Sequence, residues 1–282
     1  MRRIGLVLVL LTSAAVRADE AADRRQTIAY VRTLQDEGGG FRPTARGTPG
    51  LRATIAAVRS LHYLGADLPH RYDAAKFVAS CFDPKTGGFA DTPGGKVDVF
   101  TTSVGLMSVV ALRIPSERYA EPASRYLSAK AKGFEDIRIA VAGFEAIEKS
   151  PPKSAEWLAE VKRPQNADGT FGSGTGKARD TGGAVVALLR MGVKIESPEP
   201  ILAALRAGQR PSGGFGKADA GEDLDSSYRI LRCFAMLKAQ PAHVDALRTF
   251  IAKCRNEDGG YGVAPGHPSN VGGVYYAAII GH

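Results

Sequence analysis

The sequence predicts an all-α protein built from repeats of a two-helix unit. Three observations support this: a Gly-Gly-aromatic motif recurs along the chain, a strongly apolar segment follows each copy, and an amphipathic segment follows that. Self-similarity with a period of roughly 20–50 residues is typical of stacked supersecondary units. A chain of 282 residues is long for one simple domain but ordinary for one assembled from repeats.

The recurring motif sets the length of the repeat. Its clear copies end at Phe41, Phe89, Phe171, Phe215 and Tyr261, with spacings of 48, 82, 44 and 46 residues. The spacing of 82 is close to two periods, so we expect a degenerate copy inside it, at "AKGF" ending at Phe134. The sequence therefore predicts six repeats of about 45 residues, the third of them degenerate.

Each repeat is expected to contain a turn and two helices. Glycine ends helices readily because it adopts the left-handed conformation. The first helices, centred near residues 58, 106, 142, 186, 231 and 275, are apolar nearly all round, as buried helices are. The second helices, near 30, 76, 124, 158, 203 and 248, are amphipathic, and no segment is a convincing strand.

Two arrangements of these helices satisfy the pattern. The six buried helices can close into a ring inside the amphipathic ones, or the units can stack as an open solenoid. In both cases the Gly-Gly-aromatic loops and the N-termini of the buried helices fall at one end. A function is expected at that end.

The N-terminus resembles a secretory signal peptide. Arg2 and Arg3 precede an apolar run of about a dozen residues, and small residues lead to Ala18, a plausible cleavage site. The run is shorter than the roughly 20 apolar residues that span a bilayer. We expect residues 1–18 to be removed and the protein to be exported, to the periplasm or the extracellular space, with no membrane span afterwards; an uncleaved anchor is the alternative.

Charge and cysteine content narrow the function classes. The net charge of +8 falls to +5 without residues 1–18, and the basic residues are scattered. We interpret them as solvated helix faces and expect no nucleic-acid partner. Cys81, Cys233 and Cys254 are an odd set without metal-binding spacing, so buried free thiols are expected.

Three segments resemble a known family. "TGGFADTPGGKVDVFTT" (86–102), "GEDLDSSYRILRCFAML" (221–237) and "RTFIAKCRNEDGGYG" (248–262) are similar to the prenyltransferase and squalene-cyclase repeats, most of all to the β subunit of type II (Rab) protein geranylgeranyltransferases. The resemblance implies an α/α toroid of six inner and six outer helices over residues 24–282. It also implies a separate α subunit as partner.

The resemblance transfers only part of the family's zinc site. Asp223 matches the family's aspartate ligand, but Asp225 stands at the cysteine position and Asn270 at the histidine position. His267 lies three residues from that position, in the preceding loop. Oxygen donors in place of a thiolate and an imidazole suit zinc poorly. We therefore expect no cofactor, and zinc is implied by resemblance alone.

The family's diphosphate-binding groups are also altered. Lys217 stands where an arginine is expected, Asp180 where a histidine is expected, and Ser226 where a tyrosine is expected. A carboxylate at Asp180 would repel a diphosphate.

Three functions follow from this comparison. The favoured one is an exported toroid with an eroded zinc site that binds a lipid, a peptide or a partner protein. The second is an active prenyltransferase with an altered metal site. The third is a terpene-cyclase-like enzyme in which Asp225, raised in pKa by an apolar cavity, acts as a general acid.

The same residues also have a purely structural interpretation. Thr101, Asp180, Asp225 and Asn270 fall near the starts of buried helices, where Asp, Asn, Ser and Thr are preferred N-caps. An apolar central cavity is expected, with aromatic candidates Tyr63, Phe100, Phe144, Tyr228, Phe234, Tyr275 and Tyr276.

Overall fold

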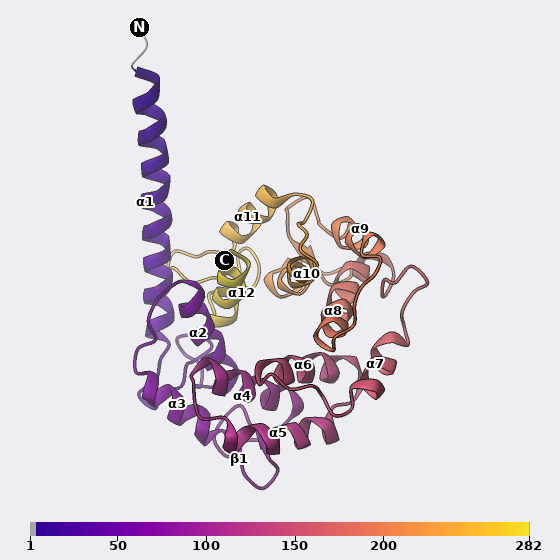
Figure 1. The fold of residues 1–282 in the computed structure, drawn as a ribbon. Coiled ribbons are helices and arrows are strands. Elements are labelled where there is room, and N and C mark those ends of the chain that lie inside the picture. The colour runs from indigo at the N-terminus through magenta and orange to yellow at the C-terminus, as the bar shows by residue number, and fades with distance from the viewer. Residues whose placement is uncertain (1–3, 282) are drawn as a thin grey trace.

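A computed structural model describes the backbone of residues 4–281 and the side chains of residues 19–281. Its inner helices stand in a ring (Figure 1). They are α2 (Leu51–Tyr63), α4 (Val99–Ala111), α6 (Gly133–Ala146), α8 (Lys177–Arg190), α10 (Leu224–Met236) and α12 (Val271–Gly281). Each packs against the next, and α12 packs against both α10 and α2. The ring is therefore closed, which confirms the toroid and excludes the open solenoid.

The amphipathic helices form an outer layer around this ring (Figure 1). They are α1 (Ile4–Thr33), α3 (Arg71–Ser80), α5 (Glu117–Lys130), α7 (Ser154–Lys162), α9 (Glu199–Ala207) and α11 (Val244–Lys253). Eleven of the twelve described helices fall at the positions that the repeat predicts, and the twelfth, α1, covers the expected position near residue 30 but begins much earlier, at Ile4. The degenerate third copy is α6, which begins at Gly133 directly after a shortened loop.

Two short antiparallel ladders and one 3₁₀ turn shape the loops. β1 (Phe82–Asp83) pairs with β2 (Gly88–Phe89), β3 (Phe215–Gly216) pairs with β4 (Glu222–Asp223), and the 3₁₀ turn is Gly174–Gly176. The sequence predicted no strand, and these two-residue ladders are too short to carry a periodic pattern. In the second ladder Phe215 lies opposite Asp223, which fixes Asp223 directly before α10.

In four of the repeats a buried hydroxyl ties the Gly-Gly-aromatic loop to the inner helix that follows. The backbone N–H of Phe89 donates to Oγ1 of Thr102 at 3.0 Å, and that of Phe215 donates to Oγ of Ser227 at 3.1 Å. Thr54 and Thr181 do the same in their repeats. A buried N–H without a partner is costly, so these hydroxyls fix the position of the loop over the helix.

The first glycine of the motif is required for two reasons, its backbone conformation and the lack of space for a side chain. Gly39 and Gly213 have φ of 88° and 95°, and a Cβ on either would lie 2.1 Å from backbone carbon of the next outer helix. A side chain there would be strained and would also collide with α3 or α11. Glycine thus lets the loop pack directly onto the outer layer.

Helix α1 completes the outer layer. Arg255 forms an ion pair with Asp23 at 3.0 Å and donates to Oε1 of Gln26 at 2.6 Å. The predicted signal peptide, residues 1–18, lies outside the part whose side chains are described. Within the described residues, no helix has the length and apolarity needed to cross a membrane.

The three cysteines are free and buried, as expected. Burial raises the pKa of each thiol to about 12, so none carries a thiolate at neutral pH.

A candidate ligand site in the lumen of the toroid

A cavity of about 870 Å³ occupies the lumen, and all six inner helices contribute to its wall. Ligand pockets in proteins are typically about 300–1,000 Å³. The lumen is therefore large enough for an organic ligand of moderate size.

The wall of this cavity is rich in arginine. Among the described residues that line it, eight are arginines and only two, Glu145 and Asp225, are carboxylates. The arginines are Arg52, Arg59, Arg71, Arg113, Arg138, Arg190, Arg229 and Arg232. The predicted cavity is therefore present but only partly apolar, and eight of the basic residues that we interpreted as solvated helix faces line it. An inner helix of a closed ring has one face on the lumen, and that face need not be apolar.

The polar residues follow one stripe along α10. Asp225, Tyr228, Arg229 and Arg232 line the cavity at helical spacings of three and four residues. The prediction that the inner helices are apolar nearly all round is therefore wrong for α10. The sequence thus contained a signal for a polar face on α10, namely polar residues spaced three and four apart, and our interpretation missed it.

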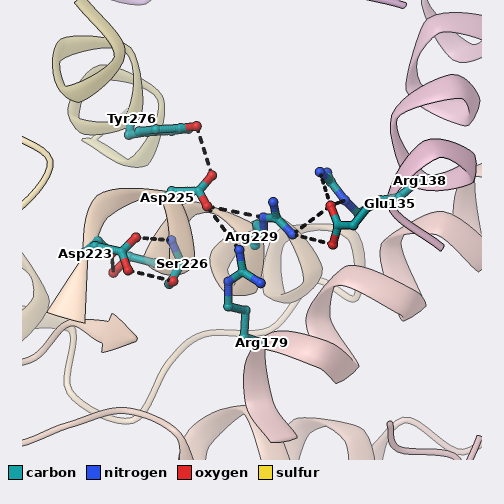
Figure 2. Close-up of polar contacts among 9 residues, drawn as sticks. Glu135, Arg138, Arg179, Asp223, Asp225, Ser226, Arg229 and Tyr276 are labelled. Atoms are coloured by element: carbon teal, nitrogen blue, oxygen red, sulfur yellow. Dashed lines mark hydrogen bonds and ion pairs between the residues drawn. The ribbon is translucent and has the colours of Figure 1, made fainter. Parts of the chain in front are cut away.

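Asp225 lies at the centre of an ion-pair network (Figure 2). The hydroxyl of Tyr276 donates to its Oδ1 at 2.9 Å. Nη2 of Arg179 lies 3.3 Å from its Oδ2, and Nε of Arg229 lies 3.4 Å from the same oxygen. Burial, and then the charge of Asp225, raise the pKa of Tyr276, so that the phenol keeps its proton and donates.

The network continues through Glu135 on α6 (Figure 2). Arg229 donates to Oε1 of Glu135 at 3.1 Å, and Arg138 donates to Oε2 at 3.0 Å. Burial alone would raise the pKa of Glu135, but Arg138 and Arg229 lower it overall. Charges thus alternate from α8 through α10 to α6.

Asp223 caps α10. Its Oδ1 accepts the backbone N–H of Ser226 at 2.6 Å, and its Oδ2 accepts the Ser226 hydroxyl at 2.8 Å. Asn270 caps α12 in the same way, since its Oδ1 accepts the N–H of Gly273 at 2.8 Å. Asp98 caps α4.

The cap assignment therefore needs correction. Asn270 is an N-cap as predicted, but Thr101 is the third residue of α4 and forms a reciprocal capping box with Asp98. Asp180 and Asp225 lie within the first turns of α8 and α10. In α10 the cap precedes the position assigned from sequence because the ladder of β3 and β4 ends at Asp223, directly before the helix.

A comparison with protein families now identifies the fold. The model of the prenyltransferase alpha-alpha toroid domain matches residues 5–76, 67–129 and 137–280. The chain belongs to the prenyltransferase α/α-toroid family. A comparison with curated protein sequences found no match.

Solved structures agree with this toroid at the level of the fold. The type II terpene cyclase MstE from Scytonema aligns with a TM-score of 0.58 and 15% identity, over 86% of this chain and 80% of that one. A protein from Actinoplanes aligns with a TM-score of 0.57 and 14% identity, over 93% and 97%. Candida albicans protein geranylgeranyltransferase-I complexed with GGPP aligns with a TM-score of only 0.26 and 15% identity, over 89% and 57%. At such low identities the first two alignments, with TM-scores above 0.5, bear on the fold alone.

The zinc donors implied by the family resemblance do not fit zinc in this toroid. Asp223 and Asn270 use their side-chain oxygens as helix caps, and Asp225 faces two guanidinium groups. His267 is exposed in the loop before α12. Within the described part of the chain, no three His, Cys, Asp or Glu side chains are placed to hold a metal ion together. Hard oxygen donors beside cations are a poor site for zinc.

The predicted diphosphate-binding residues of this toroid are not gathered in the lumen. Lys217 and Asp180 are exposed, and Ser226 is buried beneath the cap of α10. Burial raises the pKa of Asp180, against the opposing charges of Arg179 and Lys217. Of all the predicted site residues, only Asp225 and Asn270 line the cavity.

The aromatic residues divide between the lumen and the core. Tyr63, Phe100, Tyr228, Tyr275 and Tyr276 line the cavity as expected. Phe144 and Phe234 instead belong to the hydrophobic core between inner and outer helices, where Phe144 packs against Trp157 at 6.0 Å between ring centroids.

Proposed function

We propose that this toroid is a binding protein that holds an amphipathic anion in its lumen and does not carry out zinc-thiolate transfer. The observation that carries the proposal is the cavity of about 870 Å³, with eight arginines and two carboxylates among the described residues of its wall. Guanidinium groups match carboxylate and phosphate oxygens in geometry as well as charge. A cavity with this excess of arginine favours an anionic ligand over a neutral one.

The apolar part of the wall supports an amphipathic ligand. Helix α4 contributes only apolar side chains to the cavity, namely Phe100, Val104, Met107 and Ala111. The polar stripe of α10 provides a contrasting wall in the same cavity. A molecule with a hydrocarbon portion and an anionic group can satisfy both walls.

The two enzymatic alternatives have less support. Zinc-thiolate transfer needs donors that Asp223, Asp225 and Asn270 do not offer in their present contacts. Protonation of an alkene needs Asp225 to be free to face the substrate as a proton donor. In this toroid its carboxylate oxygens are already engaged by the guanidinium groups of Arg179 and Arg229 and by the hydroxyl of Tyr276.

Export is part of the proposal. The contacts that α1 makes with the ring involve Asp23, Arg24 and Gln26, which lie after the proposed cleavage site at Ala18. Removal of residues 1–18 would leave these contacts in place. Intact mass of the protein secreted by an expressing host should show a chain that begins at Asp19. A chain that retains residue 1 would contradict cleavage.

Dye binding tests the proposed function. Anilinonaphthalene sulfonate is an amphipathic anion that fluoresces in apolar surroundings, and we expect saturable binding near one dye per chain. Ala56→Trp places a bulky side chain in the lumen and should abolish this binding. Ala155→Trp, on the exposed face of α7, is the matched control and should leave it unchanged.

Two results would contradict the proposal. One is unchanged dye binding in Ala56→Trp, because the dye would then lie outside the lumen. The other is retention of about one zinc ion per chain after zinc loading and buffer exchange, which would favour the transferase.

A further inference from the structure

A second cavity, of about 440 Å³, lies outside the lumen, between the start of α1 and the end of α12. Its outer side is lined by Glu20 and Asp23 of α1, and its inner side by Ala277 and Ala278 of α12. Among the described residues, Tyr63 alone lines both this cavity and the lumen. The side chain of Tyr63 therefore separates two spaces that are each large enough for an organic molecule.

The start of α1 covers the second cavity through polar contacts. Residues 19–26 are all exposed. Nε of Arg24 donates to the carbonyl of Leu64 at 2.6 Å, and Asp23 forms its ion pair with Arg255 at 3.0 Å. Contacts of exposed charged side chains contribute little to stability, so this part of α1 can separate from the ring while the rest of the protein stays folded.

On the lumen side, two tyrosine rings close the seam between α2 and α12. The ring centroids of Tyr63 and Tyr275 lie 6.5 Å apart. Tyr275 is held from two sides, since Arg59 donates to its hydroxyl at 3.5 Å and the hydroxyl of Tyr228 lies 3.4 Å away. Tyr63 is instead the last residue of α2, two residues before Gly65, whose φ is 62°. Helix ends fray, so the side chain of Tyr63 rotates more readily than that of Tyr275.

The small residues of α12 give an apolar surface that leads to Tyr63. Near the start of α12, Val271 and Val274 share one hydrophobic cluster with Leu61 of α2, so the seam is filled there. Further along α12, Ala278 and Gly281 line the second cavity instead. Their short side chains leave the seam unfilled beneath α1, and a hydrocarbon group can follow this part of α12.

We propose that the cavity beneath α1 is a side entrance to the lumen and that the ring of Tyr63 is its gate. This rests on the proposed function and adds the path by which a ligand enters and leaves. Rotation of one side chain joins the two cavities, and separation of the start of α1 from the ring opens them to solvent. The ring of inner helices stays closed throughout.

Stopped-flow fluorescence with anilinonaphthalene sulfonate tests the entrance. Ala278→Trp fills the second cavity and adds nothing to the lumen. An obstacle on the path changes the barrier but neither end state, so the association and dissociation rate constants should both fall at least about tenfold while Kd stays constant. Ala155→Trp, on the exposed face of α7, is the matched control and should leave both rate constants unchanged.

Substitution of the gate tests the same path in the opposite direction. Tyr63→Ala removes the ring, so both rate constants should rise at least about tenfold. Tyr63→Phe keeps the ring and should exchange the dye as the unaltered protein does. If Tyr63 were only a contact of the bound dye, Tyr63→Ala would raise the dissociation rate constant alone. Thermal unfolding shows whether each variant folds, and Tyr63→Ala decides the question if Ala278→Trp does not.

The outcomes distinguish the entrance from the broader function. If the dye binds and neither Ala278→Trp nor Tyr63→Ala changes its rate constants, the dye enters elsewhere and the side entrance is wrong, while lumen binding stands. If Ala278→Trp weakens binding with an unchanged association rate constant, the second cavity holds the dye rather than passing it on, which also overturns the entrance. If the dye does not bind the unaltered protein, the proposed function fails and the entrance fails with it.

Discussion

The guanidinium of Arg179 on α8 lies 3.3 Å from the carboxylate of Asp225 on α10. The resemblance places Asp225 where the family's zinc-bound cysteine stands, and a second guanidinium, from Arg229, lies 3.4 Å from the same oxygen. A metal ion at Asp225 would have to replace these cations or sit beside them. This position therefore joins two inner helices by ion pairs rather than offering a metal ligand.

The network predicts the effect of Asp225→Asn. Loss of this carboxylate leaves Arg179 and Arg229, whose side chains are 13% and 16% exposed, without one of their anions. We expect the free energy of unfolding to fall by about 1–3 kcal/mol, less than for a fully buried pair because Asp225 is itself 36% exposed. Urea denaturation measures the change. Asp245→Asn, at a 95% exposed partner of Arg248, should change stability by less than about 0.5 kcal/mol. Equal effects of the two variants would count against the network.

Substitution of Asp223 and of Asp98 by alanine should lower the stability of the protein by similar amounts. Both cap an inner helix by accepting the backbone N–H three residues later. Asp223→Ala and Asp98→Ala should each lower the free energy of unfolding by about 0.5–2 kcal/mol. Neither should alter the zinc content after zinc loading, measured by elemental analysis. A loss of bound zinc confined to Asp223→Ala would show that Asp223 is a metal ligand after all.

The buried threonines should matter more than exposed ones. Thr102→Val removes the acceptor of the Phe89 N–H, which is buried, while it conserves the shape of the side chain. An unsatisfied buried N–H costs about 1–3 kcal/mol, and we expect that loss in chemical denaturation. Thr249→Val on the exposed face of α11 is the matched control, since its hydroxyl bonds only to the carbonyl of Asp245 within the same helix. A Thr102→Val variant as stable as the control would show that the loop is held by other contacts.

The lowered pKa of Glu135 predicts that the stability of the protein depends on pH. The pKa of Glu135 in the folded protein is below the ordinary value of 4.5, because Arg138 and Arg229 outweigh the effect of burial. A depressed carboxyl pKa contributes stability that is complete above about pH 4.5 and is lost as the pH falls through the lower, folded value. Glu135→Gln should therefore lose less stability than the unaltered protein between about pH 5 and pH 3, measured by thermal unfolding. Parallel pH profiles of the two proteins would contradict the prediction.

The sequence predicted the fold well because the repeat is encoded locally. Gly39 and Gly213 mark loops in which only glycine fits, and the alternation of apolar and amphipathic helices follows from the two layers. Ring closure was left open because it depends on the angle between neighbouring units, which no single repeat specifies. The contact of α12 with α2 decides it.

The lumen was less predictable, for a physical reason. A helix inside a ring has neighbours on most sides but a free face on the lumen, and the sequence alone does not show that Arg229 and Arg232 on α10 lie on that face. The ion pair between Asp225 and Arg179 could not be predicted either. The two residues are 46 positions apart in the sequence, and they come into contact only when α8 and α10 pack together. Substitution at the positions that the resemblance assigns to zinc was visible from the sequence, whereas the ion pairs that Asp225 makes there were not.

A crystal structure of the protein with anilinonaphthalene sulfonate tests the central claim most directly. Our account predicts the dye within the lumen, its sulfonate oxygens within hydrogen-bonding distance of an arginine of the cavity wall and its rings against α4. A dye bound at the rim beside Lys217, or an empty lumen with the dye on the outer surface, would contradict it.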